Sequence, residues 1–161
     1  MKRGGILNQA LSGAIAGLGH GDLLLVVDAG FPIPRDAERI DLAIARDLPD
    51  LRTVLHLINQ ELIAERVVIA AEMAESNAPL EQWLRAEFVD AEFELVSHEE
   101  MLTSVPRRAK AIVRTGAFDP WGNIALSSGV DLPAWFSREG VLVPEYYAAR
   151  LERARAGGIE G

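Results

Sequence analysis

The sequence predicts an α/β fold: a single layered domain with a mainly parallel central sheet flanked by helices. Short apolar runs alternate along the chain with longer segments whose apolar residues recur at helical spacing, and this alternation is typical of layered α/β domains. The run at residues 23–27 is wholly apolar, as expected of a parallel strand that is buried on both faces. A length of 161 residues fits one domain.

The first predicted elements are a helix over residues 6–18 and a strand over residues 23–27. The helix has apolar residues three and four positions apart, and Gly19 would end it. After the strand, two prolines within residues 31–34 predict a rigid, extended loop, because proline restricts its own backbone and that of the residue before it.

The middle of the chain predicts two further pairs of helix and strand. Residues 50–64 and 79–88 have apolar residues at helical spacing. Each of these segments is followed by an apolar run of strand length, at residues 67–71 and 93–96. This order of helix and strand extends the predicted parallel sheet.

A new helix is expected directly after residue 96. Ser97 has the side chain of an N-cap residue, and Glu100 stands where a capping box needs a carboxylate. Residues 111–114 and 124–126 then predict two more short strands.

The end of the chain has a different character. Pro144 would begin an amphipathic helix that ends near Gly157. We therefore expect an α/β domain over residues 1–130 and a C-terminal helical extension over residues 131–161. Aromatic residues in the extension favour a role in packing between subunits over a role in a site; they are Trp135, Phe136, Tyr146 and Tyr147.

Composition excludes several classes of function. The net charge is −8 and the basic residues are scattered, whereas phosphate backbones are bound by clustered Lys and Arg, so nucleic acid is not an expected partner. A neutral small molecule would not be repelled. There is no cysteine, which excludes thiolate catalysis and favours the cytoplasm. No apolar run approaches the roughly 20 residues of a membrane span.

Polar residues follow the predicted strands, where parallel sheets bind ligands. Asp28 comes after the first strand, Glu72 after the second and His98 after the third. Asp28 has two interpretations: a carboxylate that enters a site, or one that only caps the following turn. For His98, a position at a helix N-terminus suits a neutral imidazole, and an ordinary structural role is the alternative.

The other two histidines have simpler interpretations. His20 follows the first helix, where the negative pole of a helix ending at Gly19 would favour the protonated ring. It is therefore either a functional residue or a plain helix cap. His56 lies within a helical apolar pattern and is expected to pack rather than to catalyse.

The loop over residues 114–124 is polar and contains glycine. Asn123 can donate and accept hydrogen bonds at once, which suits a sugar hydroxyl, and Trp121 offers a flat face to the C–H surface of a sugar ring. The alternative is a long hairpin turn. No glycine-rich phosphate loop and no helical pair of metal-binding histidines is present, and the histidine spacing argues against a metal site.

Three stretches together resemble the ribose pyranase/fucose mutarotase family, over about residues 1–130. They are "KRGGILNQALSGAIAGLGHGDLLLVVDAGFPIP", "ERIDLAI" and "RTGAFDPWGNIALSSGV". The resemblance implies an α/β fold, no cofactor and rings of subunits stacked into a decamer. It assigns catalytic acid/base function to His20 and substrate binding to Asp28, His98, Trp121, Gly122 and Asn123.

The sequence departs from the family pattern at three places. The sugar-binding tripeptide usually begins with tyrosine, and here Trp121 keeps the flat ring without the phenolic hydroxyl. An acidic residue commonly follows the Thr-Gly pair, and here Ala117 stands there. The chain also continues past Val130, where the family usually ends. The proline-rich loop and His98 favour the ribose pyranase branch over the fucose branch.

The implied reaction is opening and reclosing of a cyclic aldose, D-ribose above other sugars, which interconverts pyranose with furanose and one anomer with the other. It needs one proton shuttle, and histidine titrates near neutral pH. Two alternatives are a mutarotase for another sugar, such as a deoxyhexose, and a non-catalytic sugar-binding protein. A strand at about 3.3 Å per residue keeps His20 and Asp28 roughly 15 Å apart. They can share one sugar if the chain turns back sharply or, as we favour, if neighbouring subunits each supply one.

Overall fold

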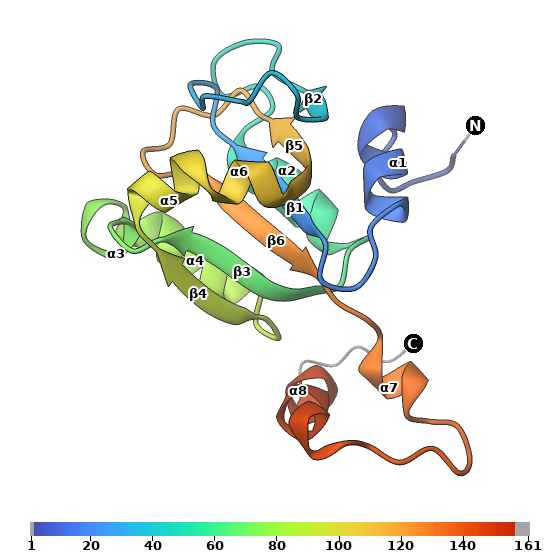
Figure 1. The fold of residues 1–161 in the computed structure, drawn as a ribbon. Helices are drawn as coiled ribbons and strands as arrows, with labels where there is room; N and C mark the ends of the chain where they lie inside the picture. Colours follow the sequence, from blue (N-terminus) through green and yellow to red (C-terminus); the bar gives the residue numbers. More distant parts are fainter. Residues whose placement is uncertain (1, 157–161) are drawn as a thin grey trace.

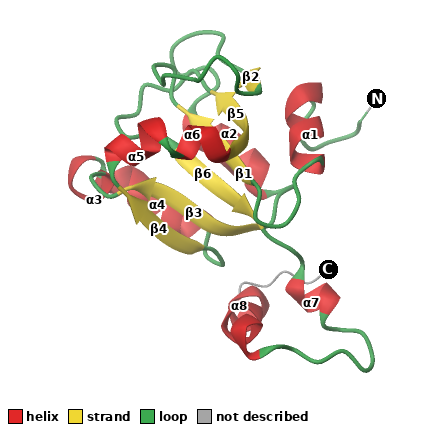
Figure 2. Ribbon diagram, in the orientation of Figure 1, coloured by secondary structure: helices red, strands yellow, loops and turns green. Residues whose placement is uncertain are grey.

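The computed structural model describes residues 2–156 and contains a six-stranded sheet of order β2-β5-β1-β6-β3-β4. Helices lie on both faces of this sheet (Figures 1 and 2). The strands are β1 Leu23–Val27, β2 Arg39–Asp41, β3 Ala64–Ala70, β4 Glu92–Val96, β5 Ala109–Arg114 and β6 Ile124–Ser128. The helices are α1 Gln9–Ala16, α2 Leu51–Asn59, α3 Met73–Ser76, α4 Ala78–Glu87, α5 His98–Thr103, α6 Val105–Arg108, α7 Leu132–Trp135 and α8 Glu145–Ala156.

The predicted α/β class with a mainly parallel sheet is confirmed. Strands β1 and β2 each pair in parallel with β5, and β3 pairs in parallel with β4. Only β6 runs the other way, antiparallel to both β1 and β3. The interpretation of residues 114–124 as a hairpin is wrong, because β5 and β6 lie on opposite sides of β1. The loop between them therefore crosses the end of β1.

Strand β1 lies in the middle of two apolar cores. Leu24 and Val26 pack with residues of α1, α2 and α4 on one face of the sheet. Leu23, Leu25 and Val27 pack with residues of α5 and α6 on the other. All five side chains are buried, which confirms the prediction of a strand covered on both faces.

The helix ends differ from the predictions where local capping decides them. Helix α1 begins after Asn8, whose side chain accepts from the Leu11 N–H, and it ends at Gly17 instead of Gly19. The predicted capping box of α5 is present, with Ser97 and Glu100 each bonded to the other's backbone N–H. The short elements β2, α3, α6 and α7 were not expected, because three or four residues show no periodicity.

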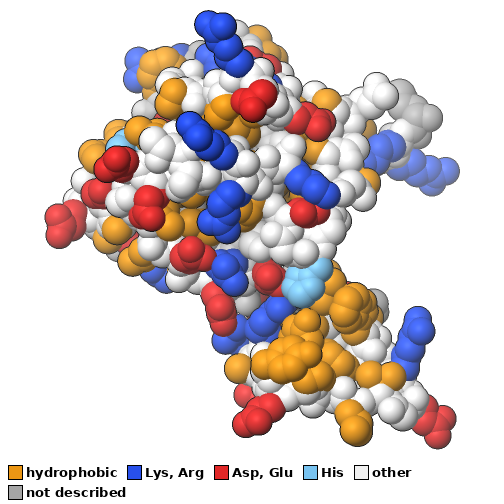
Figure 3. Space-filling model, in the orientation of Figure 1, with side chains coloured by type: hydrophobic (Ala, Val, Ile, Leu, Met, Phe, Trp, Pro, Cys, Tyr) orange, Lys and Arg blue, Asp and Glu red, His pale blue; other side chains and the backbone are white. Residues whose placement is uncertain are grey.

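The C-terminal extension consists of α7 and α8, which follow β6 and lie beyond one end of the sheet (Figure 1). The predicted helix after Pro144 is present as α8, whereas its expected end at Gly157 lies outside the described residues. Hydrophobic side chains gather on the surface of this part of the molecule (Figure 3). Leu142 is 87% exposed and Tyr146 76% exposed. Within residues 2–156, no helix has both the length and the hydropathy of a membrane span.

Candidate active site

Strands β1, β2 and β5 end at the same side of the sheet, where β6 begins. We call this side the carboxyl edge. It contains a cavity of about 530 Å³ whose lining includes Asp28, Gly30, Arg46, Arg114, Ala117 and Phe118. The cavity lies where parallel sheets usually bind ligands, beyond the carboxyl ends of the strands.

Asp28 directly follows β1, and the structure shows that it caps the following turn and lines the cavity. Oδ1 of Asp28 accepts a hydrogen bond of 2.7 Å from the Gly30 N–H, and this bond caps the turn. Asp28 is also one of the residues that line the cavity. The Asp28 N–H donates to Oδ1 of Asn123 over 3.2 Å. Asn123 is buried, so this bond fixes the start of β6 against the end of β1.

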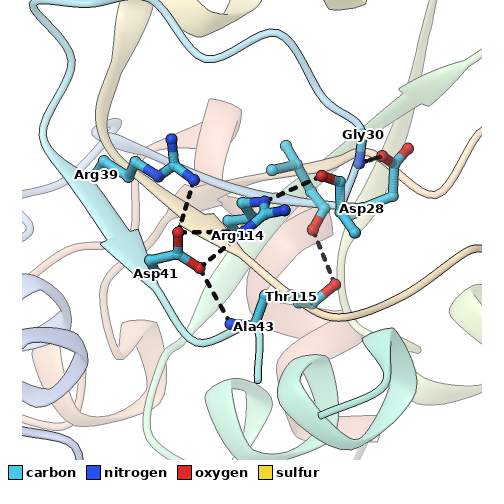
Figure 4. Close-up of polar contacts among 9 residues, drawn as sticks. Asp28, Gly30, Arg39, Asp41, Ala43, Arg114 and Thr115 are labelled. Carbon is cyan, nitrogen blue, oxygen red and sulfur yellow. Dashed lines mark hydrogen bonds and ion pairs between the residues drawn. The ribbon is translucent and has the colours of Figure 1, made fainter. Parts of the chain in front are cut away.

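Arg114 bridges the loop after β1 and the end of β2 at the carboxyl edge (Figure 4). Its Nε donates to the Ala29 carbonyl over 3.0 Å, and its Nη1 lies 3.3 and 3.2 Å from the two carboxylate oxygens of Asp41. Burial opposes ionisation of Asp41, but hydrogen bonds from Arg39 and the Ala43 N–H, with the charge of Arg114, hold the pKa of Asp41 below its ordinary value. The pair therefore stays ionised and holds the cavity rim in place.

Thr115 fastens the crossing loop to β1. Its hydroxyl donates to the Val27 carbonyl over 2.9 Å (Figure 4). The same hydroxyl accepts from the Ala117 N–H over 3.2 Å. The sequence analysis did not single out Thr115, Arg114 or Asp41 as site residues. Arg114 and Asp41 stand at the ends of β5 and β2, and that position at a strand end is the feature that could have identified them.

Asp119 is a further cavity residue that the sequence analysis missed. Burial raises the pKa of the Asp119 carboxyl above its ordinary value. The charge of Arg52 acts in the opposite sense, and Asp28 is among the carboxylates that add to the rise. The cavity therefore has one carboxyl group that keeps its proton to a higher pH than an ordinary aspartate.

The tripeptide Trp121–Gly122–Asn123 adopts a tight turn before β6. Trp121 has φ 57°, and the Asn123 N–H donates to its carbonyl over 2.8 Å. A Cβ on Gly122 would lie 2.8 Å from the Asp119 carbonyl oxygen, so the turn leaves no room for a side chain there. Glycine at this position follows from close packing of the backbone.

His98 lies beside Trp121, with 6.1 Å between the ring centroids. The His98 N–H donates to both carboxylate oxygens of Glu72, over 3.2 and 3.1 Å. Hydrogen bonds from its own N–H and from His98 lower the pKa of Glu72. His98 Nδ1 and Trp121 Nε1 are buried and have no hydrogen-bond partner within residues 2–156. Buried polar atoms normally have partners, so these two are suited to the hydroxyls of a ligand.

His20 lies at the opposite end of β1 from Asp28, because β1 begins at Leu23 and ends at Val27. The predicted helix end at Gly19 is wrong, and with it the helix-pole argument for His20, since α1 already ends at Gly17. Instead, His20 Nε2 lies 2.9 Å from Oε2 of Glu65, a residue of β3. The imidazole is 37% exposed, so it faces solvent from the other end of the sheet.

The expectation for His56 is also wrong, because its side chain is 53% exposed. Its Nδ1 lies 3.0 Å from Glu87 Oε1 and its Nε2 lies 3.1 Å from Gln60. His56 therefore lies on the polar side of α2, outside the apolar face formed by Leu51, Val54, Leu55 and Ile58. Within one chain, the structure thus brings together Asp28, His98, Trp121, Gly122 and Asn123 at the carboxyl edge and leaves His20 apart.

Comparison with known proteins identifies the relatives of this chain. The model of the RbsD / FucU transport protein family matches residues 1–131. D-ribose pyranase 2 of Rubrobacter xylanophilus is 66% identical over 154 residues, which cover 96% of this chain and 100% of that protein. D-ribose pyranase 1 of Streptomyces griseus is 60% identical over 151 residues, or 94% of this chain and 100% of that protein.

A solved structure agrees with the sequence relatives. The structure of Bacillus subtilis RbsD complexed with D-ribose superposes with a TM-score of 0.78 at 38% identity, covering 82% of this chain and 100% of that one. The resemblance noted in the sequence is confirmed by both kinds of comparison. The chain belongs to the RbsD / FucU transport protein family.

Proposed function

We propose that this chain is an intramolecular isomerase that interconverts the pyranose and furanose forms, and the anomers, of an aldose, with D-ribose as its sugar. The observation that carries the proposal is the cavity at the carboxyl edge. Asp28 lines this cavity, and its N–H bonds to Asn123, which belongs to the tripeptide whose Trp121 ring lies beside His98. The relatives named D-ribose pyranase support the choice of sugar, since one is 66% identical along its whole length.

His20 is the proposed acid/base. A cyclic aldose opens when the anomeric hydroxyl loses its proton and the ring oxygen gains one, and a neutral imidazole can carry out both transfers. The Glu65 carboxylate accepts hydrogen bonds only, so its contact of 2.9 Å assigns the proton of neutral His20 to Nε2. Nδ1 is then the nitrogen that takes the proton from the sugar.

The substrate-binding roles follow from chemistry at the carboxyl edge. Asp28 accepts from a sugar hydroxyl with the carboxylate oxygen that the Gly30 N–H leaves free. His98 Nδ1 and Trp121 Nε1 bond to further hydroxyls, and the indole ring covers the apolar face of the sugar. Gly122 allows the tight turn that places Asn123, whose amide NH₂ group faces a further hydroxyl.

Replacement of His20 tests the catalytic role directly. In saturation-transfer NMR on the anomers of D-ribose, His20→Ala is expected to lower the accelerated exchange rate by roughly 10²- to 10⁴-fold, the usual contribution of a general acid/base. His56→Ala is the matched control, because His56 also pairs with a glutamate but lies elsewhere on the surface. Equal rates for His20→Ala and the wild type would remove His20 from the mechanism.

The site is proposed to form between subunits of a homo-oligomer, a decamer by family resemblance. Straight strand β1 separates His20 from Asp28 within one chain, so a neighbouring subunit is the source of the histidine that faces each carboxyl edge. The exposed apolar side chains of the extension support association between copies.

Subunit mixing tests this arrangement. His20→Ala and Asp28→Asn are each expected to be inactive alone. Co-assembled in equal amounts, they should regain about a quarter of wild-type activity, because one site in four then receives an intact residue from each subunit. If both residues came from the same chain, the mixture would stay inactive.

Two other functions are alternatives that experiment can distinguish. The same reaction on another sugar, such as a deoxyhexose, is favoured by Trp121 and by the small Ala117 in the cavity lining; line broadening across a panel of unlabelled aldoses would identify that sugar. A non-catalytic sugar-binding protein would bind tightly without accelerating exchange and would show no loss of rate as one group titrates near neutral pH.

A cytoplasmic location is part of the proposal, and cell fractionation tests it.

A further inference from the structure

The carboxylate that holds His20 also binds an arginine from the C-terminal extension. Glu65 Oε2 lies 2.9 Å from His20 Nε2 and 2.6 Å from Nη2 of Arg150, which belongs to α8. The side chains of Glu65 and Arg150 are 11% and 21% exposed. One oxygen atom therefore links the proposed acid/base to the extension.

From this contact we propose that Arg150 is a positioning residue, which acts on His20 through Glu65. The inference deepens the proposed function and rests on it, since it takes His20 as the proton carrier. It assigns a role to the C-terminal extension: Arg150 sets the orientation and proton affinity of the His20 imidazole, which belongs to the domain over residues 1–130.

Arg150 is held in place from several directions. Its guanidinium lies 5.6 Å from the centroid of the Tyr147 ring, and the next residue, Leu151, is buried. One turn along α8, Arg153 Nη2 lies 2.7 Å from Glu92 Oε1 of β4. Gly129 leaves the space open, because a Cβ there would lie 3.0 Å from the Glu65 Cβ and 3.4 Å from Arg150 Nη2.

The charges around this contact give the direction of the effect. Without Arg150, the Glu65 carboxylate would act on His20 with its full negative charge and would stabilise the protonated imidazole. Arg150 binds the same carboxylate oxygen and offsets part of that negative charge. Among the other charged groups near this end of the sheet, Asp22 pairs with Lys110 and Glu92 pairs with Arg153. Asp90 and Asp131 line the small cavity that Glu65 and Arg150 also line.

The lengths of the relatives agree with this role. The two D-ribose pyranases that are 66% and 60% identical match 96% and 94% of this chain, so the matched regions extend beyond residue 131. The Bacillus subtilis structure covers only 82% of it. The coupling of Arg150 to His20 is thus expected in members with the extension and not in shorter ones.

Substitution of Arg150 tests the proposal against a matched control. Arg150→Gln removes the charge, Arg150→Lys keeps it, and Arg153→Gln removes the neighbouring ion pair on the same helix. We expect Arg150→Gln to lower kcat about tenfold, a part of the full acid/base contribution, with KM nearly unchanged. The pH at which half the rate is lost should rise, because Glu65 would then act on His20 without a competing cation. Arg150→Lys should restore most of the kcat and most of the wild-type pH dependence. Arg153→Gln should resemble the wild type.

A measurement without substrate separates this inference from the proposed function. The ¹⁵N signals of the His20 ring, followed against pH in the intact protein, should show a higher titration midpoint in Arg150→Gln than in the wild type and in Arg153→Gln. An unchanged midpoint and ring signal, or a kcat loss equal in Arg150→Gln and Arg153→Gln, would overturn the positioning role. Failure of the proposed function would look different: the wild type would accelerate the exchange of no sugar.

Discussion

At the scale of single residues, the candidate site depends on close backbone packing as much as on polar side chains. Asn123 fixes the Asp28 backbone, and Gly122 lies so near Asp119 that no side chain fits between them. The sequence identified these residues through a resemblance and through the chemistry of amides and aromatic rings. It could not identify the bond between Asn123 and Asp28, because the two residues are distant along the chain.

Gly122→Ala should damage the site, because the new Cβ would lie 2.8 Å from a backbone oxygen and 3.2 Å from Leu51 Cδ2. Overpacking of this kind costs about 1 to 3 kcal/mol, and displacement of the tripeptide should raise KM. Gly13→Ala is the control. A Cβ at residue 13 would have no atom within 4 Å, and alanine in a helix should stabilise the protein by about 0.5 to 1 kcal/mol relative to glycine. Urea unfolding and NMR exchange rates check both. Equal stability for the two variants would contradict the packing argument.

At the scale of elements, local capping decides where each functional residue stands. Helix α5 begins at His98 because Ser97 and Glu100 satisfy each other's backbone N–H groups. The pattern was visible in the sequence, since a capping box involves only four consecutive residues. Helix α1, by contrast, ends at Gly17 and not at Gly19, so a sequence with several glycines near a helix end did not settle which one stops it.

Ser97→Ala is expected to destabilise the protein by about 1 kcal/mol, the usual value of an N-cap. It should also weaken sugar binding, because the loosened first turn of α5 carries His98. Ser104→Ala is a suitable comparison, since the Ser104 side chain caps no helix. Denaturant midpoints and the KM for exchange provide the measurement; a change in stability alone, with unaltered KM, would show that α5 does not place His98.

At the scale of the whole molecule, the sheet separates two groups of functional residues. The carboxyl edge holds the sugar-binding candidates, and the opposite end holds His20 with Glu65 and Arg150. We propose that residues 131–161 form an extension of the domain over residues 1–130, docked through charged contacts to β3 and β4.

A chain that ends at Val130 is expected to fold, because all six strands and all the buried residues of both apolar cores lie before residue 130. Its sugar affinity should match the wild type, and its kcat should fall by the same factor as in Arg150→Gln. Circular dichroism and exchange NMR make the comparison. A truncated chain with full kcat would show that the extension does not act on His20.

From the amino-acid order alone it was possible to predict the fold class, the buried strands, the capping box and, through resemblance, the candidate residues. Periodicity and capping are local properties, and a family pattern is read in order along the chain. Only the tertiary structure decided that β5 and β6 flank β1, that Arg114 bridges to Asp41, and that Glu65 joins His20 to Arg150. These contacts join residues that are far apart along the chain. A strand or a charged side chain has many possible partners in the sequence, and the packing of the strands selects one of them.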